Sequence, residues 1–254
     1  MKTILKRIGR KLGIVPAAQG SSTAYEVIEP QAVEDTGLDG WWDQSVAERQ
    51  DAAYRKLLDE MHAGHLRVDF NVAAEAVRAT GLAGPSLLEV GCGSGYYNEV
   101  FAHLLETPVQ YTGLDYSGAM IDVARRRYPA VPFVVGSATE LPFPDGSFDI
   151  VMNGVALMHI PDYIKAIAES RRAARKWCIY HTVPVHRKRP TTFLRKQAYG
   201  RPTVEISFNE SELREHFAAA GLEIRKVQES IPYDLVAVLG EPTVTKTFLC
   251  EVIA

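Results

Sequence analysis

The chain has 254 residues, of which 46% are hydrophobic and 23% charged, and its formal net charge is −3. These values are ordinary for a globular protein and exclude a wholly disordered chain, a collagen-like chain and a coiled coil. They give no whole-molecule reason for binding nucleic acid or a membrane, and no apolar run reaches the ~20 residues that span a bilayer. The widely spaced Cys92, Cys178 and Cys250 indicate neither a disulfide framework nor a metal site, so we expect a reducing, cytoplasmic setting.

The N-terminal region divides into a basic arm and an acidic stretch. Residues 1–14 carry five Lys/Arg and have apolar residues at helical spacing. They predict a short amphipathic helix that either docks on the rest of the chain or makes weak contact with a membrane surface. Residues 26–51 then contain eight Asp/Glu and a single base, Arg49.

Two helices are predicted before the main domain. Ser45 and Glu48 have the spacing of a capping box ahead of an apolar helical face, and Gly64 ends that helix. A second helix is predicted from 69 to 80. We interpret residues 1–83 as a basic arm followed by a helical flank or lid.

The pair Trp41 and Trp42 lies just before these helices. Adjacent tryptophans in a polar stretch are candidates for lining a substrate or cofactor pocket. Packing of the flank onto the core is the alternative interpretation.

Short apolar runs alternate with amphipathic stretches through residues 84–254, which we interpret as the main domain. Strands are predicted at 86–90, 109–114, 131–135, 148–153, 177–183, 223–231 and 245–253, and helices at 95–106, 118–127, 162–174 and 210–220. This alternation indicates an α/β fold with a doubly wound, seven-stranded, mostly parallel sheet. The last two strands have no helix between them, so the final strand can run antiparallel. An insertion is predicted at about 185–209.

A glycine-rich turn is the strongest motif in the chain. Residues 87–95 read Leu-Leu-Glu-Val-Gly-Cys-Gly-Ser-Gly, so that an apolar strand leads into a turn and then into a helix. Glycines allow positive φ and let a ligand approach the backbone without meeting a Cβ atom. In an open α/β sheet this turn lies at the carboxyl edge, where ligands bind.

The glycine spacing and two nearby acids indicate the kind of ligand. A dinucleotide site has the pattern G-x-G-x-x-G, but here Tyr96 stands where the last glycine is needed. Glu89 would repel a phosphate and would accept a cationic, amino-acid-like group. Asp115, at the tip of the next strand, can accept both hydroxyls of a ribose. These features predict a site for a positively charged nucleoside without phosphate, and they exclude an NAD-dependent oxidoreductase.

This combination resembles class I S-adenosylmethionine-dependent methyltransferases over roughly residues 84–254. Three more segments are similar to the small-molecule branch of type 11 methyltransferases, which includes ubiquinone-biosynthesis enzymes. They are Leu-Asp-Tyr-Ser-Gly-Ala-Met at 114–120, Leu-Pro-Phe-Pro-Asp-Gly-Ser-Phe-Asp at 141–149 and Leu-Met-His-Ile-Pro-Asp at 157–162.

The resemblance implies S-adenosylmethionine as the cofactor and assigns residues to its parts. Those around the methionine part are Glu89, Gly91, Cys92, Gly93 and Gly95. Asp115 would hold the ribose, while the adenine would meet Tyr116, Met120, Ser137 and Ala138, with Asn153 behind the sulfonium.

Two departures from the family stand out. The family commonly has Asp at the position of Ser137, so adenine recognition here would depend on a hydroxyl or on backbone groups. The Pro-Gly-Gly turn that is common before the fifth strand is replaced by the basic residues 171–176.

Methyl transfer from an activated leaving group mainly requires alignment and exclusion of water. A hydroxyl acceptor also requires a base, for which histidine is suited by its pKa near ~6.5. His159, after the fourth strand, is the candidate catalytic base, with a packing role as the alternative. His181, on the fifth strand, is a candidate for the substrate site with the same alternative. No metal site is predicted.

The segment 165–201 holds eleven Lys/Arg and one acid. A group of six basic residues contains the candidates for binding an anionic acceptor such as a carboxylate, a phosphate or a nucleotide-linked sugar, namely Arg187, Lys188, Arg189, Arg195, Lys196 and Arg201. Within it we assign the acceptor site to Arg187, Arg189 and Arg195. A solvated loop that balances the acidic stretch at 26–51 is the rival interpretation.

The sequence therefore predicts methyl transfer to a small-molecule, anionic acceptor, with O-methylation favoured over N or C. A nucleic-acid methyltransferase is an alternative because of the basic segment. However, DNA amino-methyltransferases commonly have Asn/Asp-Pro-Pro-aromatic where this chain has Asn153-Gly-Val-Ala, so we expect no nucleic-acid partner. A non-catalytic protein that retains the cofactor fold is the third reading.

Overall fold

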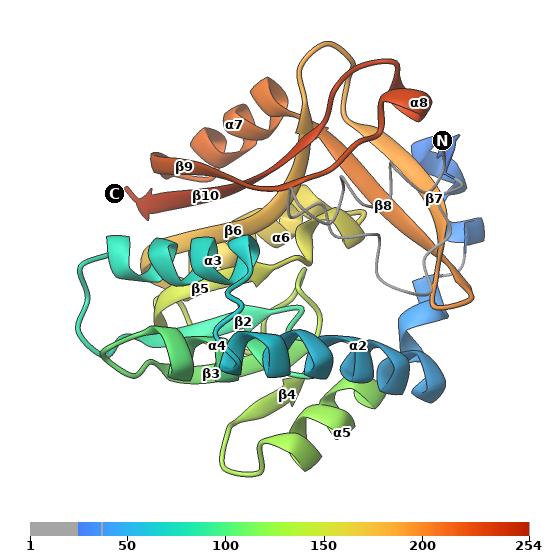
Figure 1. Cartoon of the computed structure of the whole chain (residues 1–254). Coiled ribbons are helices and arrows are strands. Elements are labelled where there is room, and N and C mark those ends of the chain that lie inside the picture. Colours follow the sequence, from blue (N-terminus) through green and yellow to red (C-terminus); the bar gives the residue numbers. More distant parts are fainter. Residues whose placement is uncertain (1–24, 37, 254) are drawn as a thin grey trace.

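The computed structural model describes residues 25–36 and 38–253, which Figure 1 shows as one body built around a twisted sheet. The basic helix predicted within residues 1–14 lies outside the described residues.

The central part of the sheet has seven strands in the order β4–β3–β2–β5–β6–β10–β9. Neighbours pair in parallel except β10, which runs antiparallel between β6 and β9. The predicted doubly wound, mostly parallel sheet is therefore confirmed. The strands are β2 (Ser86–Val90), β3 (Gln110–Asp115), β4 (Phe133–Val135), β5 (Phe148–Gly154), β6 (Ala174–His186), β9 (Leu222–Pro232) and β10 (Val244–Val252).

The helices begin at polar side chains that satisfy backbone N–H groups. The Ser117 hydroxyl accepts the N–H of Met120 at 3.2 Å, and the Asn209 side chain accepts that of Ser211 at 2.9 Å. The helices are α2 (Gln44–His62), α3 (Val68–Ala79), α4 (Tyr96–Leu104), α5 (Gly118–Arg127), α6 (Tyr163–Ala173), α7 (Glu210–Ala219) and the short α8 (Val236–Leu239). Three 3-10 helices are η1 (Pro30–Thr36), η2 (Leu38–Trp42) and η3 (Leu157–His159).

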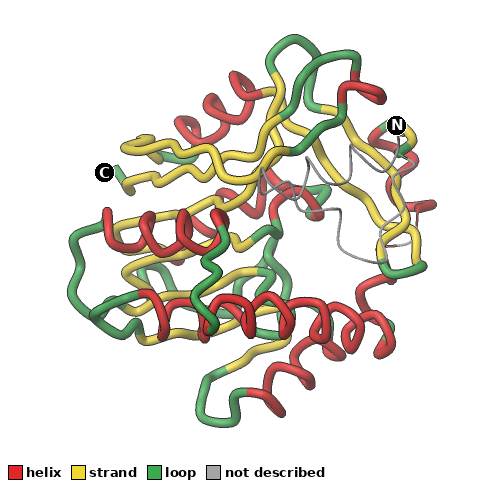
Figure 2. Tube along the Cα trace, viewed as in Figure 1, coloured by secondary structure: helices red, strands yellow, loops and turns green. Residues whose placement is uncertain are grey.

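Two hydrophobic clusters bury the two faces of the sheet. One cluster joins α3, α4 and α5 to β2 and β5 through residues such as Phe70, Phe101 and Ile121. The other joins α6 and α7 to the opposite face through Ile167 and Phe217. Figure 2 shows the sheet between these helices, with α2 lying along α4 and α5. This layering leaves the carboxyl ends of β2, β3 and β5 side by side at one edge.

Helix α2 begins earlier than predicted, and the capping box at Ser45 and Glu48 is wrong. Asp43 is the N-cap, because its backbone is extended and its carboxylate accepts the Ser45 N–H at 2.8 Å. Glu48 instead accepts a hydrogen bond from Gln44, one turn earlier. Asp and Ser are both common N-cap residues, so the residue types alone do not show whether Asp43 or Ser45 caps the helix. The backbone conformation shows that Asp43 does.

The segment predicted as an insertion at 185–209 is a β-hairpin attached to the sheet. Strand β6 continues to His186, and the hairpin strands β7 (Thr192–Ala198) and β8 (Arg201–Asn209) follow. Tyr199 and Gly200 form its turn, both with positive φ, as two-residue hairpin turns require. The N-terminal strand β1 (Glu26–Ile28) pairs with β7, so part of the N-terminal region is strand rather than helix.

None of the helices within residues 25–36 and 38–253 is long and apolar enough to cross a membrane. The same part of the chain contains no cluster of three or more His, Cys, Asp or Glu residues that could hold a metal ion.

Candidate functional site

The glycine turn after β2 is held in place by Asp115, at the end of β3. One carboxylate oxygen of Asp115 accepts the Gly93 N–H at 2.9 Å, and the other accepts the Ser117 N–H at 2.9 Å. Gly91 has φ +72°, and a Cβ atom there would overlap the Ala156 side chain. A side chain at this position would therefore close the space above the strand ends. Burial raises the pKa of Asp115, while its backbone hydrogen bonds act in the opposite direction.

Glu89 lies beneath this turn and is almost completely buried. Its Oε2 atom accepts a hydrogen bond from the Tyr111 hydroxyl, but its Oε1 atom has no partner among the described residues. A Cβ atom at Gly154 would overlap this Oε1 atom, so the free oxygen lies against Gly154. Burial raises the pKa of Glu89 well above its usual range. A buried acid with an unsatisfied oxygen is suited to meeting a cationic group.

A cavity of about 350 Å³ opens above these strand ends. Most of the residues predicted to bind the cofactor line one end of it, namely Gly91, Cys92, Gly93, Asp115, Tyr116, Met120 and Ala138. Gly154, next to the free oxygen of Glu89, lines it too. The structure therefore brings together in one cavity the glycine turn, Asp115 and most of the residues that the resemblance assigned to the adenine.

Four predicted cofactor residues are not in the cavity lining. Glu89 and Gly95 lie directly behind it, as supports of the turn. Ser137 contacts Thr139 at 2.8 Å between the hydroxyl oxygens, while its neighbours Gly136 and Ala138 line the cavity. The Asn153 amide donates to the Ser170 hydroxyl at 3.0 Å, which turns it toward α6. The direct roles predicted for Ser137 and Asn153 are therefore not supported by their positions.

His159 lines the cavity beyond the glycine turn. Its Nδ1 atom lies 2.7 Å from the carbonyl oxygen of Val204, on β8. Because a carbonyl only accepts, Nδ1 carries the hydrogen and Nε2 of the neutral ring is left as a proton acceptor. Burial, followed by the nearby charge of Lys196, lowers the pKa of His159. The ring is therefore neutral near pH 7.

Aromatic side chains form a further part of the cavity wall. Trp41 lines it, with its ring 5.5 Å from that of His159 and 6.1 Å from that of Tyr199. Tyr25 and Tyr233 line it from the beginning and the end of the chain. Trp42 points elsewhere: its side chain is 62% exposed and lies beside Tyr116, so only one of the two predicted tryptophans contributes to the cavity.

His181 is buried in the sheet and does not line the cavity, which corrects its assignment to the substrate site. Its Nδ1 atom contacts the Thr247 hydroxyl at 2.8 Å and its Nε2 atom the Thr182 hydroxyl at 3.0 Å. Burial lowers its pKa to about 4. The packing interpretation therefore describes His181.

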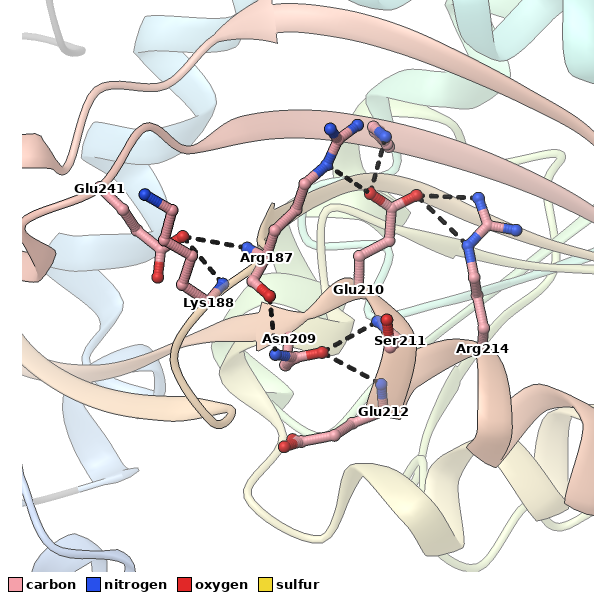
Figure 3. Close-up of polar contacts among 9 residues, drawn as sticks. Arg187, Lys188, Asn209, Glu210, Ser211, Glu212, Arg214 and Glu241 are labelled. Carbon is pink, nitrogen blue, oxygen red and sulfur yellow. Dashed lines mark hydrogen bonds and ion pairs between the residues drawn. The ribbon is translucent and has the colours of Figure 1, made fainter.

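The arginines predicted to bind an anionic acceptor also lie outside the cavity lining. Figure 3 shows Glu241 accepting backbone N–H groups at the start of the basic loop, with Arg187 extending toward Glu210. The Arg189 N–H donates to Glu241 as well, at 2.9 Å. Arg195, on the outer side of β7, pairs with Glu26 at 2.5 Å.

These contacts fit the alternative interpretation, in which the basic segment is a solvated loop that balances the acidic stretch at 26–51. Arg195 pairs with Glu26, and Arg201 pairs with Asp43 at 2.6 Å. Both acids belong to the acidic stretch at 26–51, so these pairs attach the hairpin to the N-terminal region.

Sequence reasoning missed Tyr25, Tyr199 and Tyr233, and it named Lys196 only as one of a basic group; all four residues line the cavity. Lys196 follows Arg195 directly, and successive strand residues point to opposite faces. Recognising 192–198 as a strand would have raised the question of which face turns inward. The tyrosines carried no sequence signal, because they come from segments that are far apart in the chain.

Comparisons with known proteins agree with this geometry. Residues 88–179 match the methyltransferase domain family. A probable S-adenosylmethionine-dependent methyltransferase of Mycolicibacterium smegmatis is 33% identical over 147 residues, which cover 56% of this chain and 53% of the relative. A demethylmenaquinone methyltransferase of Geobacillus stearothermophilus is 33% identical over 121 residues, covering 46% of this chain and 51% of the relative. The chain thus spans about half the length of the curated relatives it matches.

A solved structure shows the same fold over most of the chain. It is the Burkholderia thailandensis 1,6-didemethyltoxoflavin-N1-methyltransferase with bound 1,6-didemethyltoxoflavin and S-adenosylhomocysteine. It has a TM-score of 0.55 and 19% identity, covering 92% of this chain and 94% of that one. Residues 88–179 thus carry a methyltransferase domain, as the motifs indicated, and the chain is similar to S-adenosylmethionine-dependent methyltransferases.

Proposed function

We propose that this protein transfers a methyl group from S-adenosylmethionine to a small-molecule acceptor. The observation that carries the proposal is one cavity that joins the glycine turn and Asp115 to the free Nε2 side of His159. A binding site for a charged nucleoside and a neutral base thus share the same enclosed space.

The residues at the turn fit the cofactor. Asp115 retains free lone pairs for ribose hydroxyls after accepting the two backbone N–H groups. The unpartnered Glu89 Oε1 atom, at the cavity wall formed by Gly154, would receive positive charge of the amino-acid part. When bound, S-adenosylmethionine supplies an electrophilic methyl group on a sulfonium centre. The chain's own task is then to orient the acceptor and to exclude water.

His159 supports methylation of a hydroxyl. The bond from Nδ1 to the Val204 carbonyl fixes the tautomer, so Nε2 can take the acceptor's proton. The lowered pKa of His159 keeps Nε2 unprotonated near neutral pH. Trp41 packs near the ring and covers it from solvent. A base is needed for a hydroxyl acceptor, which is why we favour O-methylation over N- or C-methylation.

We favour a small-molecule acceptor because side chains from the N-terminal region, η3 and the hairpin line the same cavity as the glycine turn. The relative named for demethylmenaquinone supports the same class. The cavity lining includes no arginine of the basic loop, so the site itself gives no support to a nucleic-acid acceptor. Arg187, Arg189 and Arg195 lie outside the cavity lining and therefore do not support an anionic acceptor. The proposal does not require the acceptor to carry a negative charge.

The test is incubation of the full chain with methyl-labelled S-adenosylmethionine and fractionated cell metabolites, following which fraction gains label. We expect the label in a small-molecule fraction. If a hydroxyl is methylated, the labelled methyl group should remain attached after treatment with base. Thermal shift with S-adenosylhomocysteine, NAD and oligonucleotides should show stabilisation by the first alone. Stabilisation by oligonucleotide, or none by S-adenosylhomocysteine, would contradict the proposal.

A further inference from the structure

The cavity has a second polar centre, on the hairpin and opposite the glycine turn. It is formed by Lys196, Glu205, Tyr25 and Tyr233, which we call the hairpin tetrad. Lys196, Tyr25 and Tyr233 line the cavity, and Glu205 is completely buried behind them. Tyr25 precedes β1, Lys196 and Glu205 lie on the two hairpin strands, and Tyr233 follows β9. The tetrad therefore forms only when the chain folds.

Hydrogen bonds link the members of the tetrad. Lys196 and Tyr233 each donate to one carboxylate oxygen of Glu205. Because the Tyr233 hydrogen is used, the Tyr25 hydroxyl donates to Tyr233, with 2.7 Å between the oxygens. The Lys196 ammonium also lies over the Tyr25 ring, 5.7 Å from its centroid. An ammonium has three N–H donors and Glu205 accepts one of them, so Lys196 has a remaining N–H for the cavity.

The charge of this centre is already balanced. Lys196 and Glu205 carry opposite charges in direct contact, and each is largely or wholly buried. Burial alone would lower the pKa of Lys196, but the Glu205 carboxylate outweighs it and raises that pKa. Lys196 therefore stays protonated and cannot serve as a base. An anion entering here would lose its hydration and gain no net opposite charge in return.

A further buried polar atom lies on the same face. Thr203 is directly opposite Lys196 in the hairpin register, so both side chains share one face. The Thr203 hydroxyl is buried and has no partner within the described residues. Thr203 is not part of the cavity lining, so its hydroxyl belongs to the polar interior behind Lys196 and does not itself face the acceptor.

The walls beside the tetrad are flat and apolar. Tyr199 lines the cavity from the turn of the hairpin. Its ring lies against Trp41, with an angle of 68° between the planes. Ile231 completes the wall from β9.

From this geometry we infer that the hairpin tetrad selects the acceptor: a neutral, flat ring whose oxygen receives the remaining N–H of Lys196 while a neighbouring hydroxyl faces His159. The inference rests on the proposed function and adds the chemical class of the acceptor. Lys196 is a specificity-determining residue in it, and Glu205 is a positioning residue that orients the ammonium and cancels its charge.

Three naphthalene probes that differ at one position test this inference. 2,3-Dihydroxynaphthalene has the neighbouring oxygen, 2-naphthol lacks it, and 3-hydroxy-2-naphthoate replaces it with a carboxylate. Calorimetry on the full chain saturated with S-adenosylhomocysteine measures their dissociation constants. We expect the dihydroxy probe to bind about tenfold more tightly than 2-naphthol, as one charge-assisted hydrogen bond allows. The naphthoate should bind no better than 2-naphthol.

Two variants assign the preference to the tetrad. Lys196→Met with Glu205→Gln removes both charges together, which avoids leaving a lone buried carboxylate. We expect it to bind S-adenosylhomocysteine and 2-naphthol as the wild type does, and to lose the preference for the dihydroxy probe. Arg195→Met is the matched control, one residue away on the outer side of the same strand. It should keep the preference.

The outcomes separate this inference from the proposed function. Failure of S-adenosylhomocysteine to bind would overturn the proposed function itself. If S-adenosylhomocysteine binds and none of the probes does, or if the naphthoate binds most tightly, the inference on the acceptor is wrong. Equal losses in the double variant and in Arg195→Met would also overturn it. The wild-type ranking decides the question even if the double variant does not fold.

Discussion

The two ends of the cavity are built in different ways. The cofactor end comes from short segments at the carboxyl ends of neighbouring parallel strands, and Asp115 holds the glycine turn by direct hydrogen bonds. The proposed acceptor end combines Tyr25, His159, Lys196 and Tyr233, and the first and last of these are more than two hundred positions apart. The first end depends on the order of strands and turns around the glycine motif. The second depends on how the hairpin and the N-terminal region fold back, so substitutions there should leave the proposed cofactor site intact.

Removing the base should break the acceptor end while leaving the cofactor end intact. We expect His159→Ala to lower turnover by about 10²–10⁴-fold, because positioned acid–base groups contribute that much. Binding of S-adenosylhomocysteine, measured by calorimetry, should stay within about twofold of wild type. His159→Gln is the control: it fills similar space and can donate to Val204, but it cannot take a proton. Full turnover in His159→Gln would mean that His159 only packs.

The same residue predicts the acid limb of the pH profile. Burial lowers the pKa of His159 from its ordinary value of about 6.5, so the ring stays neutral until the pH falls below that value. Wild-type kcat/KM should therefore be level through pH 7 and decline only below about 6.5. A decline that begins above pH 7 would contradict this assignment.

Removing the ribose acid should break the cofactor end. Asp115→Ala deletes a carboxylate that can make two charge-assisted hydrogen bonds, each worth ~1.5–3 kcal/mol. We expect the dissociation constant for S-adenosylhomocysteine to rise at least about a hundredfold. The substitution also frees the Gly93 and Ser117 N–H groups, so thermal unfolding must be measured alongside. Asp115→Asn keeps the shape and should show a smaller loss of affinity.

Glu89 tests the proposed cofactor end in a second way, because its buried negative charge destabilises the folded protein when no ligand is bound. Its folded pKa is raised above the unfolded value, so the folded state binds the proton more tightly and loses stability as pH rises through that interval. Glu89→Gln lacks this loss. The stability of the variant relative to wild type, from urea unfolding without ligand, should therefore grow between pH 5 and pH 8. Its affinity for S-adenosylhomocysteine should fall about tenfold.

The smallest effect is expected at the outer side of the hairpin. Arg195 and Glu26 are 41% and 61% exposed, and such ion pairs contribute ~0–1 kcal/mol. Arg195→Met should lower the free energy of unfolding by no more than that and leave turnover within about twofold. A loss comparable to that of His159→Ala would place Arg195 in the acceptor site after all.

Prediction from sequence succeeded where function depends on neighbours in the chain. The turn at 87–95 and Asp115 were found because parallel strands end at one edge, so residues after consecutive strands must meet. His159 was found by the same logic, since it follows the fourth strand. Ser137 and Asn153 were assigned by family resemblance, and their side chains turn toward Thr139 and Ser170 instead. Their neighbours Gly136, Ala138 and Gly154 line the cavity, whereas Ser137 and Asn153 do not.

The acceptor end escaped prediction because its contacts are between distant segments. The basic residues at 187–201 were visible, but the side of the strand on which each lies was not. In the observed register Lys196 lies opposite Thr203, and Arg195 points to the other face of the strand. A shift of one residue would move every side chain of the strand to the opposite face.

The order of hydrophobic runs, glycines and acids in the sequence by itself determined the sheet, the edge at which ligands bind and the class of cofactor, since these follow from periodicity and from steric limits on the backbone. Only the tertiary structure decided which cation enters the cavity, which histidine keeps a free nitrogen and where the first and last parts of the chain meet. Those properties depend on register and burial, which arise from packing between segments that no local pattern connects.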